Sequence, residues 1–129
     1  MRVRAEAGIP IKKKTSILCA FSIEDTNVAI GLGKFNKKID QTISQSLQEI
    51  KGKKGKIAII HSHKEISSER ILIAGLGKKN KLTSDVIRDV TGNITKKIHE
   101  LGIKEFTIIT PEKISIKNDH VVSAIVEGA

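Results

Sequence analysis

The sequence contains no tryptophan and no tyrosine, and three phenylalanines are its only aromatic residues. Proteins that bind single-stranded nucleic acid stack bases on aromatic side chains, so this scarcity disfavours that class of function. The chain has one cysteine, Cys19, so it can form no intramolecular disulfide. A reducing, cytoplasmic environment is therefore expected.

Long apolar runs are also missing. The longest apolar block, residues 71–76, is interrupted by a glycine, and it falls far short of the roughly 20 residues that a membrane helix needs. The first residues alternate charged and apolar side chains and lack the apolar region of a secretory signal. We therefore expect a cytoplasmic protein that has no membrane partner.

What the sequence has in excess is lysine. Its 129 residues include 23 basic and 14 acidic side chains, for a net charge of +9. A length of 129 residues fits one compact domain. A basic excess attracts polyanions, so DNA or another nucleic acid is kept as a possible partner. The simpler interpretation is a solvated lysine surface.

Hydropathy patterns predict short strands and amphipathic helices. Apolar or alternating segments predict strands at residues 2–8, 17–21, 28–30, 56–60, 71–74 and 106–109. The first segment alternates and is expected near a sheet edge. The segment 56–60 is continuously apolar, which is typical of a strand whose two faces are both covered.

Two helices are predicted from apolar residues that recur every three or four positions. The first helix has the stripe Ile39, Ile43, Leu47 and Ile50. The second begins after a capping Thr83, and Gly102 ends it in a left-handed conformation. Its expected inward stripe is Val86, Ile87, Val90, Ile94, Ile98 and Leu101.

A third helix, capped by Asn118 or Asp119, is expected at the end of the chain, and we expect sequence of another domain to follow it. Helices that alternate with apolar strands predict an α/β fold with a largely parallel or mixed sheet between layers of helices.

A seven-residue motif occurs twice. Residues 31–37 and 75–81 differ at one position of seven. Glycines after a strand let the backbone approach a phosphate, and neighbouring lysines add positive charge. Gly75, Gly77, Lys78 and Lys79 are therefore a candidate anion-binding loop. The alternative is that the glycines only end a strand and begin a loop, because neither copy matches the glycine pattern of a dinucleotide-binding or phosphate-binding loop.

Catalytic groups are scarce. His61 and His63 could lie on one side of a strand end, but without a third ligand a solvated loop is the simpler interpretation. His99 and His120 are isolated, and Cys19 lies in an apolar strand where a thiolate would be poorly stabilised. We therefore assign no catalytic residue and no metal ligand to this chain.

Residues 69–79, followed by 82–85 and by a helix that closes at 100–105, resemble the N-terminal domain of the leucyl (cytosol) aminopeptidase family. The terminal segment 122–129 agrees in order, so the resemblance covers nearly all of residues 1–129. It implies a macro-domain-like fold, in which helices flank a mixed sheet in a single three-layer domain.

The resembled enzymes are cytoplasmic hexamers. Their C-terminal domain binds two divalent metal ions, zinc or manganese, and removes N-terminal residues from peptides; in some bacterial members the enzyme also binds DNA. The resemblance thus implies that residues 1–129 are a non-catalytic domain that contributes to subunit assembly and precedes an absent catalytic domain. The alternative is a free-standing macro-like module that binds a phosphorylated nucleotide or nucleic acid.

Overall fold

In a computed structural model of the chain, the structure describes residues 2–6, 15–26, 28–33, 35–62, 68–111 and 118–129. Its centre is one sheet with the strand order β1-β5-β2-β4-β3. In chain order the strands are β1 (Arg2–Glu6), β2 (Thr15–Ser22), β3 (Ile57–His61), β4 (Ser68–Gly75) and β5 (Glu105–Ile109). The pairs β1–β5, β5–β2 and β2–β4 are parallel, whereas β3 runs antiparallel to β4. The mixed sheet is thus confirmed, and β1 lies at an edge as expected.

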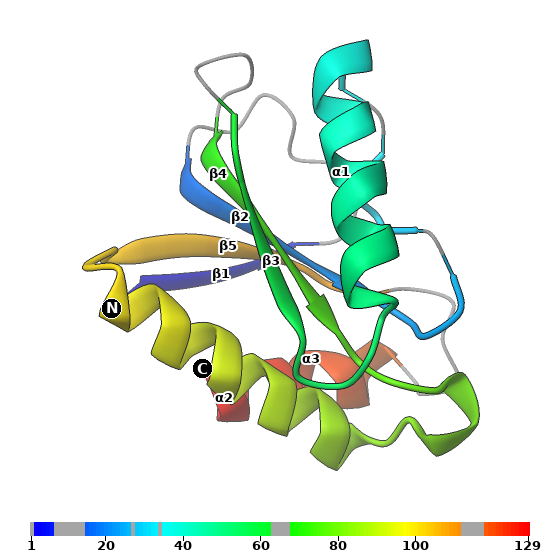
Figure 1. Ribbon diagram of the computed structural model, residues 1–129. Helices are drawn as coiled ribbons and strands as arrows, with labels where there is room; N and C mark the ends of the chain where they lie inside the picture. Colours follow the sequence, from blue (N-terminus) through cyan, green and yellow to red (C-terminus); the bar gives the residue numbers. More distant parts are fainter. Residues whose placement is uncertain (1, 7–14, 27, 34, 63–67, 112–117) are drawn as a thin grey trace.

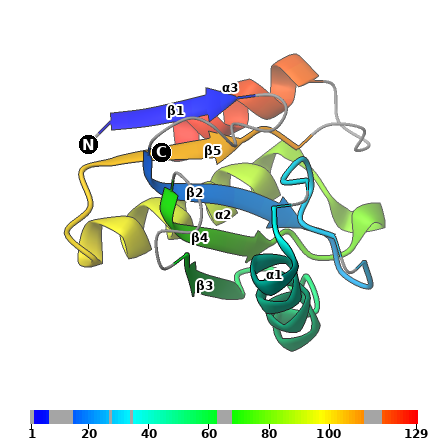
Figure 2. The ribbon, with the colours of Figure 1, turned by 90° about the horizontal axis from the view of Figure 1, so that it is seen from above.

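The helices form a layer on each side of this sheet (Figure 1). α1 (Lys37–Ile50) covers one face near β3, and α2 (Ser84–Glu100) and α3 (Asn118–Gly128) cover the other. A short 3₁₀ helix, η1 (Lys79–Lys81), links β4 to α2. Figure 2 shows the strands from above, with β1 and β3 at opposite edges. In the described part of the chain, no helix combines the length and the apolar character that crossing a membrane would require.

The core consists of two clusters, one on each face of the sheet. Along β2, Ile17, Cys19 and Phe21 point toward α2 and α3, whereas Leu18 and Ala20 point toward α1. All five side chains are at most 1% exposed. Because successive side chains of a strand point to opposite faces, a continuously apolar strand is stable only when both faces are covered.

The predicted helix signals are confirmed at both main helices. The stripe of α1 is buried, and the Asn36 side chain caps the helix by accepting a hydrogen bond from the Ile39 amide at 2.9 Å. In α2 the Thr83 hydroxyl accepts a bond from the Val86 amide. Gly102 follows the helix with a φ of 73°, a left-handed conformation that favours glycine.

Three expectations from the sequence are wrong in detail. Residues 28–30 form a loop rather than a strand, and Val28 is 57% exposed. The segment 56–60 was expected to be covered on both faces. In the structure β3 is an edge strand that pairs with β4 alone, and only Ile60 is buried, while residues 57–59 are half-buried. Leu101 is 37% exposed because it lies beyond the last turn of α2, outside the buried stripe.

The two helices on the shared face approach each other closely. A Cβ placed on Gly128 of α3 would lie 2.4 Å from the carbonyl oxygen of Arg88 in α2. The Arg88 guanidinium also bridges the helices: its Nε donates to Glu127 Oε2 at 2.7 Å, and Nη1 donates to Asp85. These hydrogen bonds raise the pKa of Arg88, with the bond to Asp85 contributing most. The bridge therefore holds α3 against α2.

Candidate functional site

Ligands of α/β proteins usually bind where parallel strands end at their carboxyl edge. Here β2, β4 and β5 end at Ser22, Gly75 and Ile109, so their following loops meet at one edge of the sheet. The described residues of both copies of the glycine motif, 31–33 with 35–37 and 75–81, lie at or after these strand ends. The edge is therefore the first place to look for a binding site.

In the second copy of the motif, three successive backbone amides are already used inside the protein. Gly75 N donates to the carbonyl of Lys56 at 2.9 Å, and Leu76 N donates to Ser22 at 2.8 Å. Gly77 N donates to the carbonyl of Gly52 at 2.9 Å. These three amides thus have internal acceptors and do not form an open cradle for an anion.

The glycines of this copy are explained by a close approach of the protein's own backbone. A Cβ on Gly75 would lie 2.1 Å from the carbonyl oxygen of Lys53 and 2.6 Å from the carbonyl carbon of Gly52. Gly77 has a φ of 88°, which a residue with a side chain rarely adopts. The turn after α1 therefore occupies the space that a phosphate would fill at Gly75.

The lysines of the candidate loop remain outside this packing. Lys78 and Lys79 are exposed, and η1 begins at Lys79. An anion bound at this loop would be contacted by these side chains rather than by the glycine amides. The anion-binding loop thus stays a prediction, and its anion-binding groups would be the lysine ammonium groups instead of the backbone amides.

The first copy of the motif has a different structure despite its nearly identical sequence. Gly31 has a φ of 77°, and a Cβ there would lie 2.8 Å from Cγ2 of Ile109 at the end of β5. Leu32 is 1% exposed and packs in the cluster on the α1 side, and Asn36 caps α1. This copy therefore closes the edge of the sheet with its own apolar side chain.

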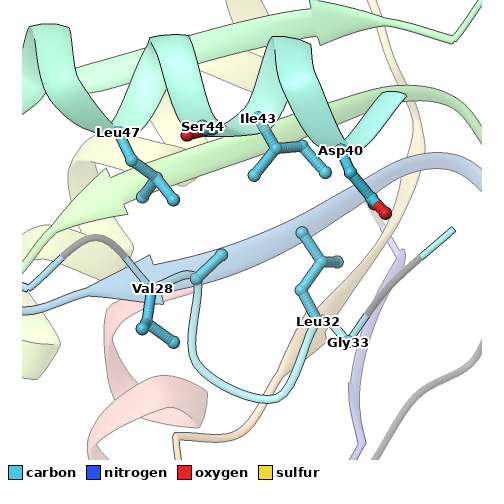
Figure 3. A pocket seen from close by; sticks show the side chains of 8 residues that line it. Val28, Leu32, Gly33, Asp40, Ile43, Ser44 and Leu47 are labelled. Carbon is cyan, nitrogen blue, oxygen red and sulfur yellow. The ribbon is translucent and has the colours of Figure 1, made fainter. Parts of the chain in front are cut away.

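A groove of about 330 Å³ lies between this loop and α1 (Figure 3). Leu32 of the loop points toward α1, where Ile43 and Leu47 line the groove, and Val28 lines its loop side. Asp40 lies at one end of the groove, and its Oδ1 accepts a hydrogen bond from the Phe35 amide at 2.9 Å. The sequence predicted the helix wall through the stripe of α1, but no pattern indicated that a loop would form the other wall.

Three of the four histidines lie in the described part of the chain, each on a different element. His61 is exposed at the end of β3, His99 is exposed on α2, and His120 is exposed on α3. The partner predicted for His61, His63, lies outside the described residues. Where the chain is described, no three His, Cys, Asp or Glu side chains form a group that could hold a metal ion.

Cys19 is confirmed as a core residue. Its side chain is fully buried between the sheet and the layer of α2 and α3. Burial raises the pKa of the thiol far above its usual range, because a thiolate would lose its hydration there. The thiol is thus held in its unreactive, protonated form.

Comparison with known proteins places this geometry in a family. Residues 17–129 match the family described as the cytosol aminopeptidase family, N-terminal domain. A probable cytosol aminopeptidase of Cenarchaeum symbiosum is 34% identical over 129 residues, which is all of this chain but 25% of that protein. One from a Sulfurihydrogenibium species is 32% identical over 118 residues, covering 89% of this chain and 23% of that protein.

Among solved structures, the macrodomain of Mycobacterium tuberculosis DarG has the same fold. Its TM-score is 0.73, and the match covers 98% of this chain and 88% of that one at 13% sequence identity. The macro-domain-like architecture is therefore shown by structure. The chain spans about a quarter of the length of the curated relatives that it matches.

Proposed function

The chain belongs to the cytosol aminopeptidase family as its N-terminal domain, and from this premise we propose that it is the non-catalytic part of a longer, cytoplasmic, metal-dependent aminopeptidase. In that enzyme a second domain removes N-terminal residues from peptides, and residues 1–129 contribute to subunit assembly. The observation that carries the proposal is the match of residues 17–129 to the family's N-terminal domain, together with a relative about four times as long as this chain.

We assign the two divalent metal ions, zinc or manganese, to that second domain. The side chains within the described ranges do not fit such a centre, since they include no group of three metal-binding residues. When bound, two such ions polarise a peptide carbonyl and lower the pKa of an attacking water. No residue of this chain is given a part in that step.

An apolar stripe on α3 supports the assembly role. Val122 is 41% exposed and Val126 is 66% exposed, and they are four residues apart on the helix face that points away from the core. Ala129, just beyond the helix, is also exposed. The relatives continue for about three quarters of their length outside the matched region. We assign this stripe as a contact between subunits of the hexamer that the longer protein forms.

The first experiment assays the purified chain on a leucine anilide with Mn²⁺ or Zn²⁺ added. We expect no hydrolysis, and hydrolysis that is lost when a histidine of the chain is substituted would overturn the proposal. The reading frame after Ala129 is the second test. It should encode roughly 300 or more further residues, two or more domain-sized units, with clustered Asp, Glu and Lys, and a stop codon there would contradict the proposal.

The assembly role is tested in the protein translated from that longer reading frame. The double variant Val122→Ser/Val126→Ser should shift the hexamer toward smaller species in analytical ultracentrifugation. Val28→Ser is the matched control, because Val28 is 57% exposed but lies in the loop opposite α1. An unchanged hexamer in the double variant would exclude the α3 stripe as an assembly contact.

A second candidate function is binding of a phosphorylated nucleotide or nucleic acid. It is favoured by the exposed Lys78 and Lys79, which follow the carboxyl end of β4. Titration of ADP-ribose and of duplex DNA into the chain, at low and at moderate salt, tests it. Absence of binding to both at low salt would remove this candidate, since electrostatic binding is strongest there.

A further inference from the structure

The two edges of the sheet differ in how they are protected against pairing with another strand. At one edge, β1 has the sequence RVRAE, in which three of five residues are charged. At the other edge, β3 has the sequence IAIIH, in which four of five residues are apolar and none is lysine or proline. Charged residues and proline are what usually keep an exposed strand edge from pairing with another chain. β3 is therefore the unprotected edge.

The hydrogen-bond register shows which backbone groups of β3 point outward. β3 pairs with β4 in an antiparallel register. At the two ends of β3, Lys56 O and Ser62 N each form a hydrogen bond of 2.9 Å with a backbone group of β4. Inward and outward residues alternate along such a strand, so the N–H and C=O groups of Ile57 and Ile59 point away from β4. Among the residues that the structure describes, no strand lies on that side of β3.

The side chains of β3 offer an added strand an apolar surface on both faces. Ile57 and Ile59 are half-buried against the core cluster beneath α2 and α3. Ala58 is half-buried against the cluster beneath α1. A strand laid along β3 would cover the exposed part of these side chains and bond to the outward backbone groups. Extended peptides bind sheet edges through this combination of backbone hydrogen bonds and side-chain contacts.

The charge beside this edge favours a particular kind of peptide. The turn that leads into β3 carries the exposed side chains of Lys51, Lys53, Lys54 and Lys56. Lys54 Nζ lies 3.7 Å from Asp89 Oδ2, and such an exposed pair contributes little stability and can exchange for another anion. Carboxylates of an added strand are therefore attracted to the start of β3. In a strand antiparallel to β3, the end at that position is the carboxyl end, where a peptide has its terminal carboxylate.

We propose that the outer edge of β3 binds an extended peptide, antiparallel to the strand, with an acidic carboxyl end beside the lysine-rich turn. A second copy of β3 fits less well, because its sequence IAIIH has no carboxylate to place beside the lysines. The amino end of the bound peptide extends past His61 and is not held. In the longer enzyme, this site would hold a peptide substrate by its carboxyl end, and that role rests on the proposed function.

The probe is an eight-residue peptide that alternates valine and threonine, ends in two glutamates and carries fluorescein at its amino end. Its binding to the chain is followed by fluorescence anisotropy at 50 mM NaCl. The test variant is Ile59→Pro, which removes an outward N–H that β4 does not use, and proline is tolerated at such positions of edge strands. Ile59→Val keeps the N–H and is the matched control. Circular dichroism verifies that both variants fold.

We expect Ile59→Pro to weaken binding about fivefold or more, because one backbone hydrogen bond corresponds to about that factor in affinity. Ile59→Val should weaken it less than about twofold. A peptide with lysines in place of the glutamates and an amidated carboxyl end should bind at least about tenfold more weakly than the probe. This difference should shrink at 500 mM NaCl, because salt screens the charges.

Peptides methylated on their backbone nitrogens test the same pairing on the wild-type chain, should Ile59→Pro not fold. One peptide is methylated at the odd-numbered positions of the probe and a second at the even-numbered positions. Only one of these sets faces β3 in a paired strand. We therefore expect one methylated peptide to lose binding and the other to retain it, and equal effects of the two would contradict strand pairing.

Other results would overturn the proposal. A wild-type chain that does not bind the probe, or an Ile59→Pro chain that folds and binds it as tightly as the wild type, would exclude this edge as a peptide site. Equal binding of the acidic and the lysine-containing peptides would exclude the lysine-rich turn as its acidic-end contact. Self-association of the chain in sedimentation equilibrium that Ile59→Pro abolishes would assign the edge to a second copy instead.

The substrate role is tested in the longer enzyme with the unlabelled peptide extended by an N-terminal leucine. Ile59→Pro should raise KM for this peptide at least about threefold relative to KM for a leucine anilide, which is too short to reach β3. An unchanged ratio would overturn the substrate role. Absence of any hydrolysis by the wild-type longer protein would instead contradict the proposed function, and peptide binding by the chain alone separates these two failures.

Discussion

Replacing Gly75 by alanine tests the contact that joins the turn after α1 to the end of β4. The added Cβ would lie 2.1 Å from the carbonyl oxygen of Lys53 and 2.6 Å from the carbonyl carbon of Gly52. Both neighbours are backbone atoms, so no side chain can rotate away to make room. The turn must move as a unit, or the strand end must leave its register.

The cost follows from the hydrogen bonds that such a movement breaks. Gly75 N bonds to Lys56 O at 2.9 Å, Gly77 N to Gly52 O at 2.9 Å, and Gly55 N to Gly75 O at 3.2 Å. Loss of two or three backbone bonds at about 1 kcal/mol each lowers the free energy of unfolding by about 2–3 kcal/mol. For a domain of this size, that lowers Tm by about 10 °C.

Urea unfolding followed by far-ultraviolet circular dichroism measures this change, because the chain has no tryptophan or tyrosine to report by fluorescence. The matched control is Gly92→Ala in α2, where a Cβ would approach only the Gly128 carbonyl oxygen, at an ordinary 3.6 Å. Alanine favours a helix over glycine, so this variant should be unchanged or more stable by up to about 1 kcal/mol.

The two glycine variants should therefore shift the urea midpoint in opposite directions or by very different amounts. A Gly75→Ala protein that unfolds at the wild-type midpoint with the wild-type m value would refute the close contact as a stability determinant. A lower midpoint in both variants, by equal amounts, would point to a general effect of the substitution.

Further predictions concern the helix layer and the buried thiol. Gly128→Ala should lower the free energy of unfolding by about 1–3 kcal/mol in urea titrations, because its Cβ would lie 2.4 Å from the Arg88 carbonyl oxygen; an unchanged midpoint would contradict this. Arg88→Met should lower Tm more at 20 mM than at 500 mM NaCl, since salt screens exposed ion pairs; equal losses would assign the effect to packing. Cys19 should resist iodoacetamide until the protein unfolds. Its pKa is raised in the folded state, so stability is full below the unfolded value near 9 and falls as pH rises above it. Urea titrations from pH 7 to 10 should show a steeper loss for the wild type than for Cys19→Ala, and parallel losses would refute this.

Local signals made the helices predictable from the sequence. The stripe of α1, the Thr83 cap and the left-handed Gly102 each depend on residues within one or two helical turns. The burial of Cys19 was predictable for a similar reason, since a short apolar run identifies an inner strand. The alternation in residues 2–8 likewise predicted a strand near a sheet edge, and β1 lies at an edge over Arg2–Glu6.

The predictions from the sequence were wrong where an apolar residue packs into the core without belonging to a helix or strand. Residues 28–30 have the apolar character of a strand, yet Ala29 is buried against α1 from a loop, and Val28 is exposed. The loop wall of the groove beside α1 was not predicted for the same reason, since its apolar residues lie outside any helix or strand. A sequence pattern reports that a side chain is buried, but it does not report what buries it.

The sequence by itself determined the layered α/β class, the family resemblance and the two main helices, because these depend on periodicity, capping and motif order. Only the tertiary structure decided that β1 pairs with β5 at the opposite end of the chain. It also decided that one copy of the glycine motif closes the edge of the sheet, while the other copy packs against the turn after α1. The physical reason is that both outcomes depend on backbone contacts between segments far apart in sequence, and a local pattern carries no information about such contacts.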